Sequence, residues 1–137
     1  MAHNHRQIGE VAERTGLSLR TIRYYEEVGL ITPSARSQGG FRLYTEEDIA
    51  RLDVVKAMKP LDFSLDEMRG LLESLDTLDD PAATAKDHAD ALERLDMFHA
   101  ATDERCQALR RQLSIAEGFA EQLRTHTIRH QAVSPRT

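Results

Sequence analysis

The stretch SLRTIRYYE, residues 18–26, decides the fold expected for this chain. As a helix it places Arg20, Arg23 and Tyr24 on one side, because residues three and four positions apart share a face, and Ile22 on the other. One side is therefore suited to packing on a core, whereas the other is basic and aromatic. Arginine binds both DNA phosphates and guanine edges. The stretch predicts a recognition helix for duplex DNA, although an ordinary helix with two solvated arginines would show the same pattern.

A second short helix is predicted directly before this stretch. Ile8, Val11 and Ala12 have the i, i+3, i+4 spacing of one helical face. Gly16 suits the left-handed position that ends a helix, and Ser18 suits the N-cap of the next one. Two short helices joined by a tight glycine turn form the helix-turn-helix pattern.

A β-hairpin is predicted after the second helix. The pair Gly39–Gly40 marks a turn, and after it Phe41 alternates with Arg42 and Tyr44 along a short strand. Arg42 and Tyr44 share one side of that strand, and Arg36 lies across the turn. The hairpin would be a wing with phosphate contacts beside the recognition helix. The alternatives are a core position for Tyr44 and a solvated edge charge for Arg42.

Two further helices are predicted by their N-terminal caps. Thr45 with Asp48, and Ser64 with Glu67, have the spacing of capping boxes, and an apolar helical stripe follows each. Pro60 forces a break between the two helices. The acidic residues here are interpreted as caps and partners of the helix dipole, not as catalytic pairs.

Four segments together resemble the N-terminal domain of the MerR family of transcriptional regulators. They lie at residues 8–12, 21–30, 40–44 and 63–68. The resemblance implies a mainly α fold: a winged helix-turn-helix domain at residues 6–75 with a small β-hairpin wing, followed by a long antiparallel coiled-coil dimerisation helix. It also implies a homodimer that binds a near-palindromic operator in a promoter. The dimer would bend and untwist the DNA there, at a promoter used by RNA polymerase.

The resemblance also implies which side chains would bind DNA. From the recognition helix and its cap they are Ser18, Arg20, Thr21, Arg23 and Tyr24, and from the wing Arg36, Arg42 and Tyr44. The sequence departs from the family pattern at Asp62, where glycine is usual, and at Pro60, where a helix former is common. We expect a shifted helix end there, because neither position belongs to the DNA-binding face.

The last part of the chain predicts a dimerisation helix within residues 80–129. Asp80–Pro81 has the form of an N-cap followed by proline at the first helical position. Residues with the spacing of a coiled-coil seam follow: Leu92, Leu95, His99, Thr102, Cys106, Leu109 and Leu113. Gly118 is interpreted as a possible break, after which residues 119–129 could form a short last helix; the alternative is a helix that continues past Gly118. Residues 130–137 are interpreted as a flexible tail.

The middle of this seam is polar, at His99, Thr102 and Cys106. The simpler interpretation is that these side chains meet partner residues at the two-fold axis; the alternative is a site for a ligand, a proton or a redox reaction. Metal sensors of the family use a C-terminal cysteine pair, and no cysteine follows Gly118. We therefore expect no metal and no cofactor, and the sequence identifies no effector.

Charge and composition limit the possible functions. The net charge is −5, but residues 1–44 carry six Arg and four Glu, so the basic surface is N-terminal. No apolar run approaches the roughly 20 residues that span a bilayer, and a cytoplasmic protein without membrane contact is expected. No nucleophile with a base, phosphate loop or other catalytic motif indicates an enzyme. The sequence favours a regulator that binds double-stranded DNA; the alternative is a coiled-coil adaptor whose winged domain binds a protein.

Overall fold

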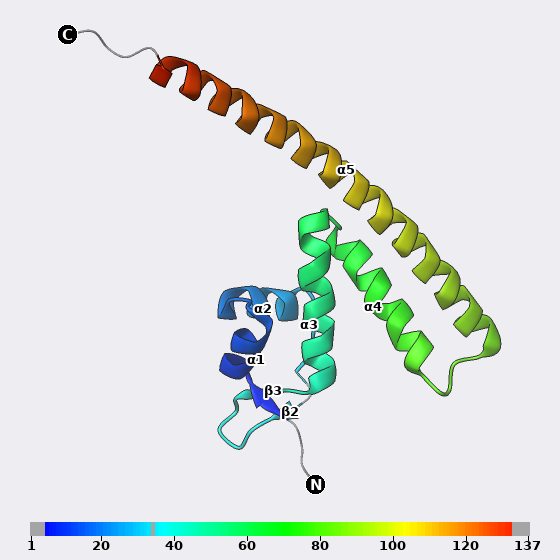
Figure 1. The fold of residues 1–137 in the computed structure, drawn as a ribbon. Helices are drawn as coiled ribbons and strands as arrows, with labels where there is room; N and C mark the ends of the chain where they lie inside the picture. Colours follow the sequence, from blue (N-terminus) through cyan, green and yellow to red (C-terminus); the bar gives the residue numbers. More distant parts are fainter. Residues whose placement is uncertain (1–4, 34, 133–137) are drawn as a thin grey trace. The chain divides into compact units, whose positions relative to one another are not determined.

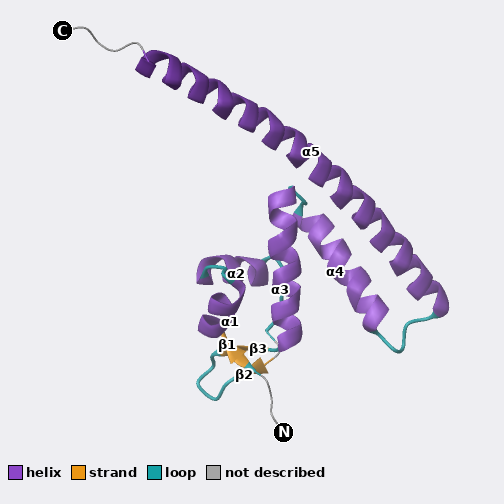
Figure 2. Ribbon diagram, in the orientation of Figure 1, coloured by secondary structure: helices purple, strands orange, loops and turns teal. Residues whose placement is uncertain are grey.

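A computed structural model of the chain describes residues 5–33 and 35–132. The chain divides between Phe98 and His99 into two compact units, which are described separately. The elements, shown in Figures 1 and 2, are β1 (Arg6–Gln7), α1 (Ile8–Thr15), α2 (Leu19–Glu27), β2 (Ala35–Arg36), β3 (Arg42–Tyr44), α3 (Glu46–Met58), the 3-10 turn η1 (Lys59–Leu61), α4 (Leu65–Asp79) and α5 (Ala85–Ala132). None of the described helices combines the length and apolar character needed to cross a bilayer.

The helix-turn-helix is present as predicted. Helix α1 ends at Gly16, which has a φ of 75° and donates its N–H to the carbonyl of Ala12 at 2.9 Å. A side chain at this φ would be strained, which explains the glycine. Ser18 then caps α2, because its Oγ accepts the N–H of Thr21 at 3.0 Å. The turn is therefore fixed by one left-handed residue and one side-chain cap.

Two cations from later helices hold the C-terminal ends of α1 and α2. Lys56 on α3 donates through Nζ to the carbonyl of Thr15 at 2.5 Å, and Arg69 on α4 donates through Nη2 to the carbonyl of Val28 at 2.6 Å. The last carbonyls of a helix lack intrahelical partners and carry partial negative charge, so cations stabilise them. The helix-turn-helix is thus tied to the rest of the domain by backbone atoms as well as by its core.

The wing is part of a three-stranded antiparallel sheet in the order β1-β3-β2. The hairpin pairs Arg36 with Arg42, and the N-terminal strand pairs Arg6 with Tyr44. The hairpin was predicted, but β1 was not, because residues before α1 were interpreted only as a polar arm. Two residues are too few to show an alternation.

The core of the first unit lies around α3, which stands between the α1–α2 pair and α4 in Figure 1. Its fully buried side chains include Val11, Ile22, Tyr44, Leu52, Val55 and Leu72. Both predicted capping boxes are confirmed, at Thr45 with Asp48 and at Ser64 with Glu67. Between them Asp62 has a φ of 67°, a left-handed conformation that glycine adopts more readily than other residues.

The start of α5 differs from the prediction. The helix begins at Ala85 and not at Pro81, because Thr84 is the cap: its Oγ1 accepts the N–H of Asp87 at 3.0 Å. Asp80 instead accepts the N–H of Ala82 in the preceding turn. The first turns of α5 then lie along α4 (Figure 2). The centre of the Phe98 ring on α5 lies 6.2 Å from that of Phe63, just before α4.

The second unit is the continuation of α5. The helix passes through Gly118 without interruption to Ala132, so the predicted break and the separate last helix are wrong. Residues 130–132 of the predicted tail are helical, and residues 133–137 lie outside the described part of the chain. One glycine costs a helix only about 1 kcal/mol relative to alanine, too little to end one of 48 residues.

The turn between α1 and α2 can be tested at its glycine. Replacing Gly16 by alanine should lower the free energy of unfolding by roughly 1–2 kcal/mol, because the left-handed conformation is strained for an L side chain. Gly9→Ala is the matched control, since a Cβ there meets nothing within 4 Å. It should leave stability unchanged or raise it by up to about 1 kcal/mol. Equal effects in urea denaturation would contradict the proposed role of Gly16.

The continuity of α5 can be tested at Gly118. Gly118→Ala should raise the free energy of unfolding by about 1 kcal/mol, because alanine loses less backbone entropy in a helix. Far-ultraviolet circular dichroism during denaturation measures this. A destabilising effect would indicate that the helix turns or ends at this residue.

Candidate nucleic-acid interface

Helix α2 presents the basic face predicted from the sequence. Ile22 and Tyr25 are buried at 0% and 2% exposure, whereas Tyr24 is 44% exposed and both arginines are exposed. Arg20, Arg23, Tyr24 and Glu27 surround a hollow of about 540 Å³ on the outer side of the helix. The helix therefore combines a fixed inner face with a charged and aromatic outer face.

Ser18 and Thr21 bind each other at the start of α2. The Ser18 hydroxyl donates to Thr21 Oγ1 at 2.9 Å, in addition to accepting the Thr21 N–H. Both side chains belong to the helix cap, at the N-terminal end of the basic face. A helix N-terminus carries partial positive charge, which favours a neighbouring phosphate.

The wing carries two arginines next to each other. Arg36 donates through Nη1 to the carbonyl of Gly40 at 3.1 Å and is exposed, while the Arg42 side chain is 40% exposed. Phe41 is 63% exposed beside the glycine turn. It precedes the three-residue strand β3, so the alternation of a strand does not extend to it.

Tyr44 is a correction to the predicted DNA-binding set. Its side chain is fully buried, and its hydroxyl donates to the carboxylate of Glu26 on α2. Burial and this hydrogen bond raise the pKa of Tyr44 above its ordinary value. Tyr44 and Arg42 do lie on one side of β3, but that side faces α2, so Tyr44 has the core position that was the alternative to a DNA contact.

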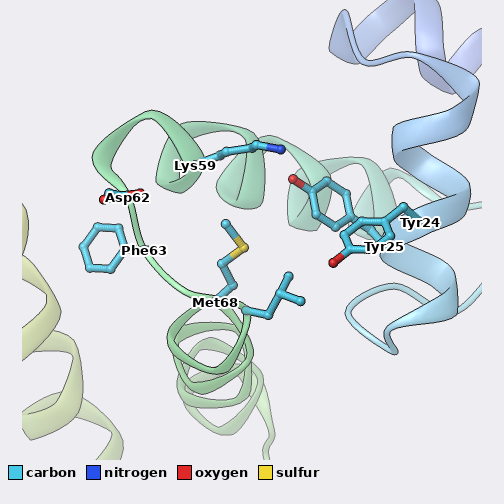
Figure 3. Close-up of a pocket in the computed structure, with 7 residues that line it drawn as sticks. Tyr24, Tyr25, Lys59, Asp62, Phe63 and Met68 are labelled. Carbon is cyan, nitrogen blue, oxygen red and sulfur yellow. The ribbon is translucent and has the colours of Figure 1, made fainter.

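A second groove, shown in Figure 3, adjoins the recognition helix on the side of η1. It measures about 260 Å³ and is lined by Tyr24, Tyr25, Lys59, Asp62, Phe63, Leu65 and Met68. Tyr24 lines both hollows, so this groove continues the basic face. Sequence reasoning missed Lys59; the available signal was a cation placed directly before Pro60, in the break between two capped helices.

The predicted dimerisation residues fall into both units. In the first, Leu92 is 45% exposed and Leu95 is half-buried; in the second, Leu109 and Leu113 are 45% and 58% exposed. Nε2 of His99 lies 3.6 Å from Oδ2 of Asp103, one turn along the same helix. Thr102 and Cys106 are half-buried. Within residues 5–33 and 35–132, no three His, Cys, Asp or Glu side chains gather in a way that could hold a metal ion.

The chain matches known proteins mainly through its N-terminal half. It is 42% identical over 74 residues to the nodulation protein NolA of Bradyrhizobium elkanii, a match that covers 54% of this chain and 34% of NolA. It is 46% identical over 69 residues to the transcriptional regulator YfmP of Bacillus subtilis, covering 50% and 49%. The chain thus spans about a third to a half of the length of these relatives.

The fold is also similar to solved structures over most of the chain. One is HiNmlR, described as a MerR family regulator lacking the sensor domain and bound to promoter DNA. It has a TM-score of 0.63 and 23% identity, covering 85% of this chain and 79% of that one. At this identity the likeness shows the fold alone.

A family model settles the relationship. The model described as "MerR HTH family regulatory protein" matches residues 6–75, which contain the helix-turn-helix, the wing, α3 and the larger part of α4. The chain belongs to the MerR family of helix-turn-helix regulatory proteins.

Proposed function

We propose that this protein is a transcription regulator that binds duplex DNA through α2 and the wing. The observation that carries the proposal is the pair of exposed arginines, Arg20 and Arg23, on a short helix whose opposite face is buried. The major groove admits an α-helix, and arginine is the side chain that most often reads guanine there. The relative YfmP is named a transcriptional regulator, and HiNmlR is described as bound to promoter DNA, which supports the same role here.

The neighbouring surfaces supply phosphate contacts in this proposal. Arg36 and Arg42 extend from the wing, and Lys59 lies across the second groove from the recognition helix. Contacts to phosphates fix the position of a protein on the duplex, whereas contacts to base edges give specificity. Arg20 and Arg23 would read bases, and the cations on either side of α2 would hold the backbone.

The protein would act as a homodimer through α5. Large apolar side chains are exposed along its C-terminal half, among them Leu109, Leu113, Phe119 and Leu123. Exposed large apolar side chains that gather on one helix are typical of a protein–protein interface. Two identical recognition helices related by a two-fold axis would bind a near-palindromic operator. Bending of that operator, and cooperation with RNA polymerase, are part of the proposal and rest on the family resemblance.

DNA binding can be tested at the recognition helix. Arg20→Ala and Arg23→Ala should each weaken binding by roughly tenfold or more, because losing a base contact from arginine costs about 1–3 kcal/mol. The DNA is a duplex selected by the wild-type protein from a random-sequence pool, and affinity is measured by fluorescence anisotropy. Arg111→Ala is the control, since Arg111 is exposed on α5.

Three results would count against this function. The first is failure of the wild-type protein to select any sequence at low salt. The second is equal loss of affinity in all three variants, which would indicate only a change in net charge. The third is unchanged affinity in the Arg20 and Arg23 variants, which would show that the DNA is bound through residues other than these two arginines of α2.

The dimer can be tested along the apolar stripe of α5. Leu109→Glu combined with Leu113→Glu should convert the dimer into a monomer, because charges would replace apolar side chains in the interface. Sedimentation equilibrium measures the mass, and Arg111→Ala, on another side of the helix, should leave it unchanged. A wild-type protein that sediments as a monomer at micromolar concentration would contradict the proposed dimer.

A further inference from the structure

Glu26 connects the recognition helix to the wing. It lies in the last turn of α2, and only 10% of its side chain is exposed. One oxygen of its carboxylate accepts the hydroxyl of Tyr44, and the other lies 2.7 Å from Nε of Arg42. Both partners belong to β3, so a single carboxylate joins the two elements of the proposed DNA-binding surface.

We propose that Glu26 is a positioning residue for DNA binding, which sets the wing against the recognition helix and orients the Arg42 guanidinium toward a phosphate. This inference rests on the proposed function and deepens it. Glu26 would not contact DNA itself, because its carboxylate is enclosed by its two partners. Its effect on DNA would pass through Arg42.

Strand pairing in the wing places Arg42 opposite another arginine, so the Glu26 carboxylate offsets a charge repulsion there. Arg36 and Arg42 are directly opposite in the hairpin, and like charges at such a position are destabilising. Arg36 donates to the carbonyl of Gly40 at the turn, and Arg42 has Glu26. The wing can therefore hold two arginines at paired strand positions, because each guanidinium has an oxygen partner that offsets their mutual repulsion.

The geometry of the Arg42 contact leaves part of the guanidinium available. Nε is buried and lies within ion-pair distance of Glu26, but its N–H is not directed at a hydrogen-bond acceptor. The contact is therefore an electrostatic one on the Nε side, while 40% of the side chain stays exposed. A guanidinium held on one side loses less freedom when the other side binds a phosphate.

Tyr44 keeps the carboxylate in place. The tyrosine is fully buried in the core, so its hydroxyl is a fixed donor, in contrast to a mobile surface group. A carboxylate that accepts one fixed hydrogen bond has a defined orientation for its second oxygen. The core fixes Tyr44, Tyr44 fixes the Glu26 carboxylate, and that carboxylate orients Arg42.

Positioning and simple charge predict opposite effects on DNA binding. Glu26 is an anion close to a surface that would bind a polyanion, so its neutralisation alone should strengthen binding. If Glu26 positions Arg42, neutralisation should weaken binding instead. The sign of the change therefore separates the two roles.

The experiment compares Glu26→Gln, Tyr44→Phe, Arg42→Ala and the double variant Glu26→Gln with Arg42→Ala. Glu73→Gln is the matched control, because Glu73 is exposed on α4 and loses the same charge. Two measurements are made on the full chain. One is the affinity for a mixed-sequence 30-base-pair duplex at several salt concentrations, and the other is the Arg42 Nε–H signal in the nuclear magnetic resonance spectrum of the free protein.

We expect Glu26→Gln to weaken binding by roughly tenfold and to lower the salt slope by about 0.9 for each lost phosphate contact. The double variant should bind like Arg42→Ala alone, because Glu26 acts through that residue. The Arg42 signal should move in both Glu26→Gln and Tyr44→Phe. Tyr44→Phe removes a single oxygen and serves as the second variant if Glu26→Gln does not fold.

Tighter or unchanged binding by Glu26→Gln, together with weaker binding by Arg42→Ala, would overturn the positioning role and leave the proposed function standing. Additive losses in the double variant would also overturn it, since Glu26 would then act independently of Arg42. A wild-type protein that binds no duplex at low salt would overturn both, and the Arg42 signal would then show whether the contact exists without a role in DNA binding.

Discussion

The burial of one face of α2 against the domain core is the constraint on which the rest of the proposed DNA-binding surface depends. The helix has nine residues, too few to be stable alone in water. Ile22 and Tyr25 hold it in place, and burying each such side chain contributes about 1.5–3 kcal/mol. Because these residues leave the outer face free, Arg20 and Arg23 take their direction from the core and not from contacts of their own.

The ends of α2 are fixed as firmly as its middle. Ser18 caps the first turn, and Arg69 from α4 binds the carbonyl of Val28 just after the last turn. Glu26, in that last turn, joins the helix to β3. Rotation or sliding of α2 would break contacts with two separate elements, α4 and β3, so helix and wing behave as one surface. A protein that bends DNA requires a rigid binding surface. A flexible surface would deform more easily than the duplex and would leave the DNA straight.

The elements with several agreeing signals were predictable from sequence, whereas those set by tertiary contacts were not. The capping boxes, the Gly16 turn and the two faces of α2 follow from local chemistry. Alternation placed Tyr44 and Arg42 on one side of β3 correctly, but it could not show that this side faces α2. The signals at Gly118 and Pro81 were weak local preferences. The break expected at Gly118 is outweighed by the long helix around it. The helix start expected at Pro81 is replaced by one after the better cap at Thr84.

The helix of the second unit, unlike the elements of the first, has no core of its own to fold against in the described part of the chain. A single helix with most of its apolar side chains in water is only marginally stable, so under the proposed dimer the folding of α5 and pairing of the chains are coupled. A single recognition helix with few base contacts would bind weakly by itself, whereas two linked copies would bind at an effective concentration set by their linkage. Protein concentration then controls the order of α5, the dimer and the affinity for an operator together. Under the proposed function, the exposed apolar side chains from Leu109 to Leu123 would therefore contribute to DNA recognition as Arg20 and Arg23 would.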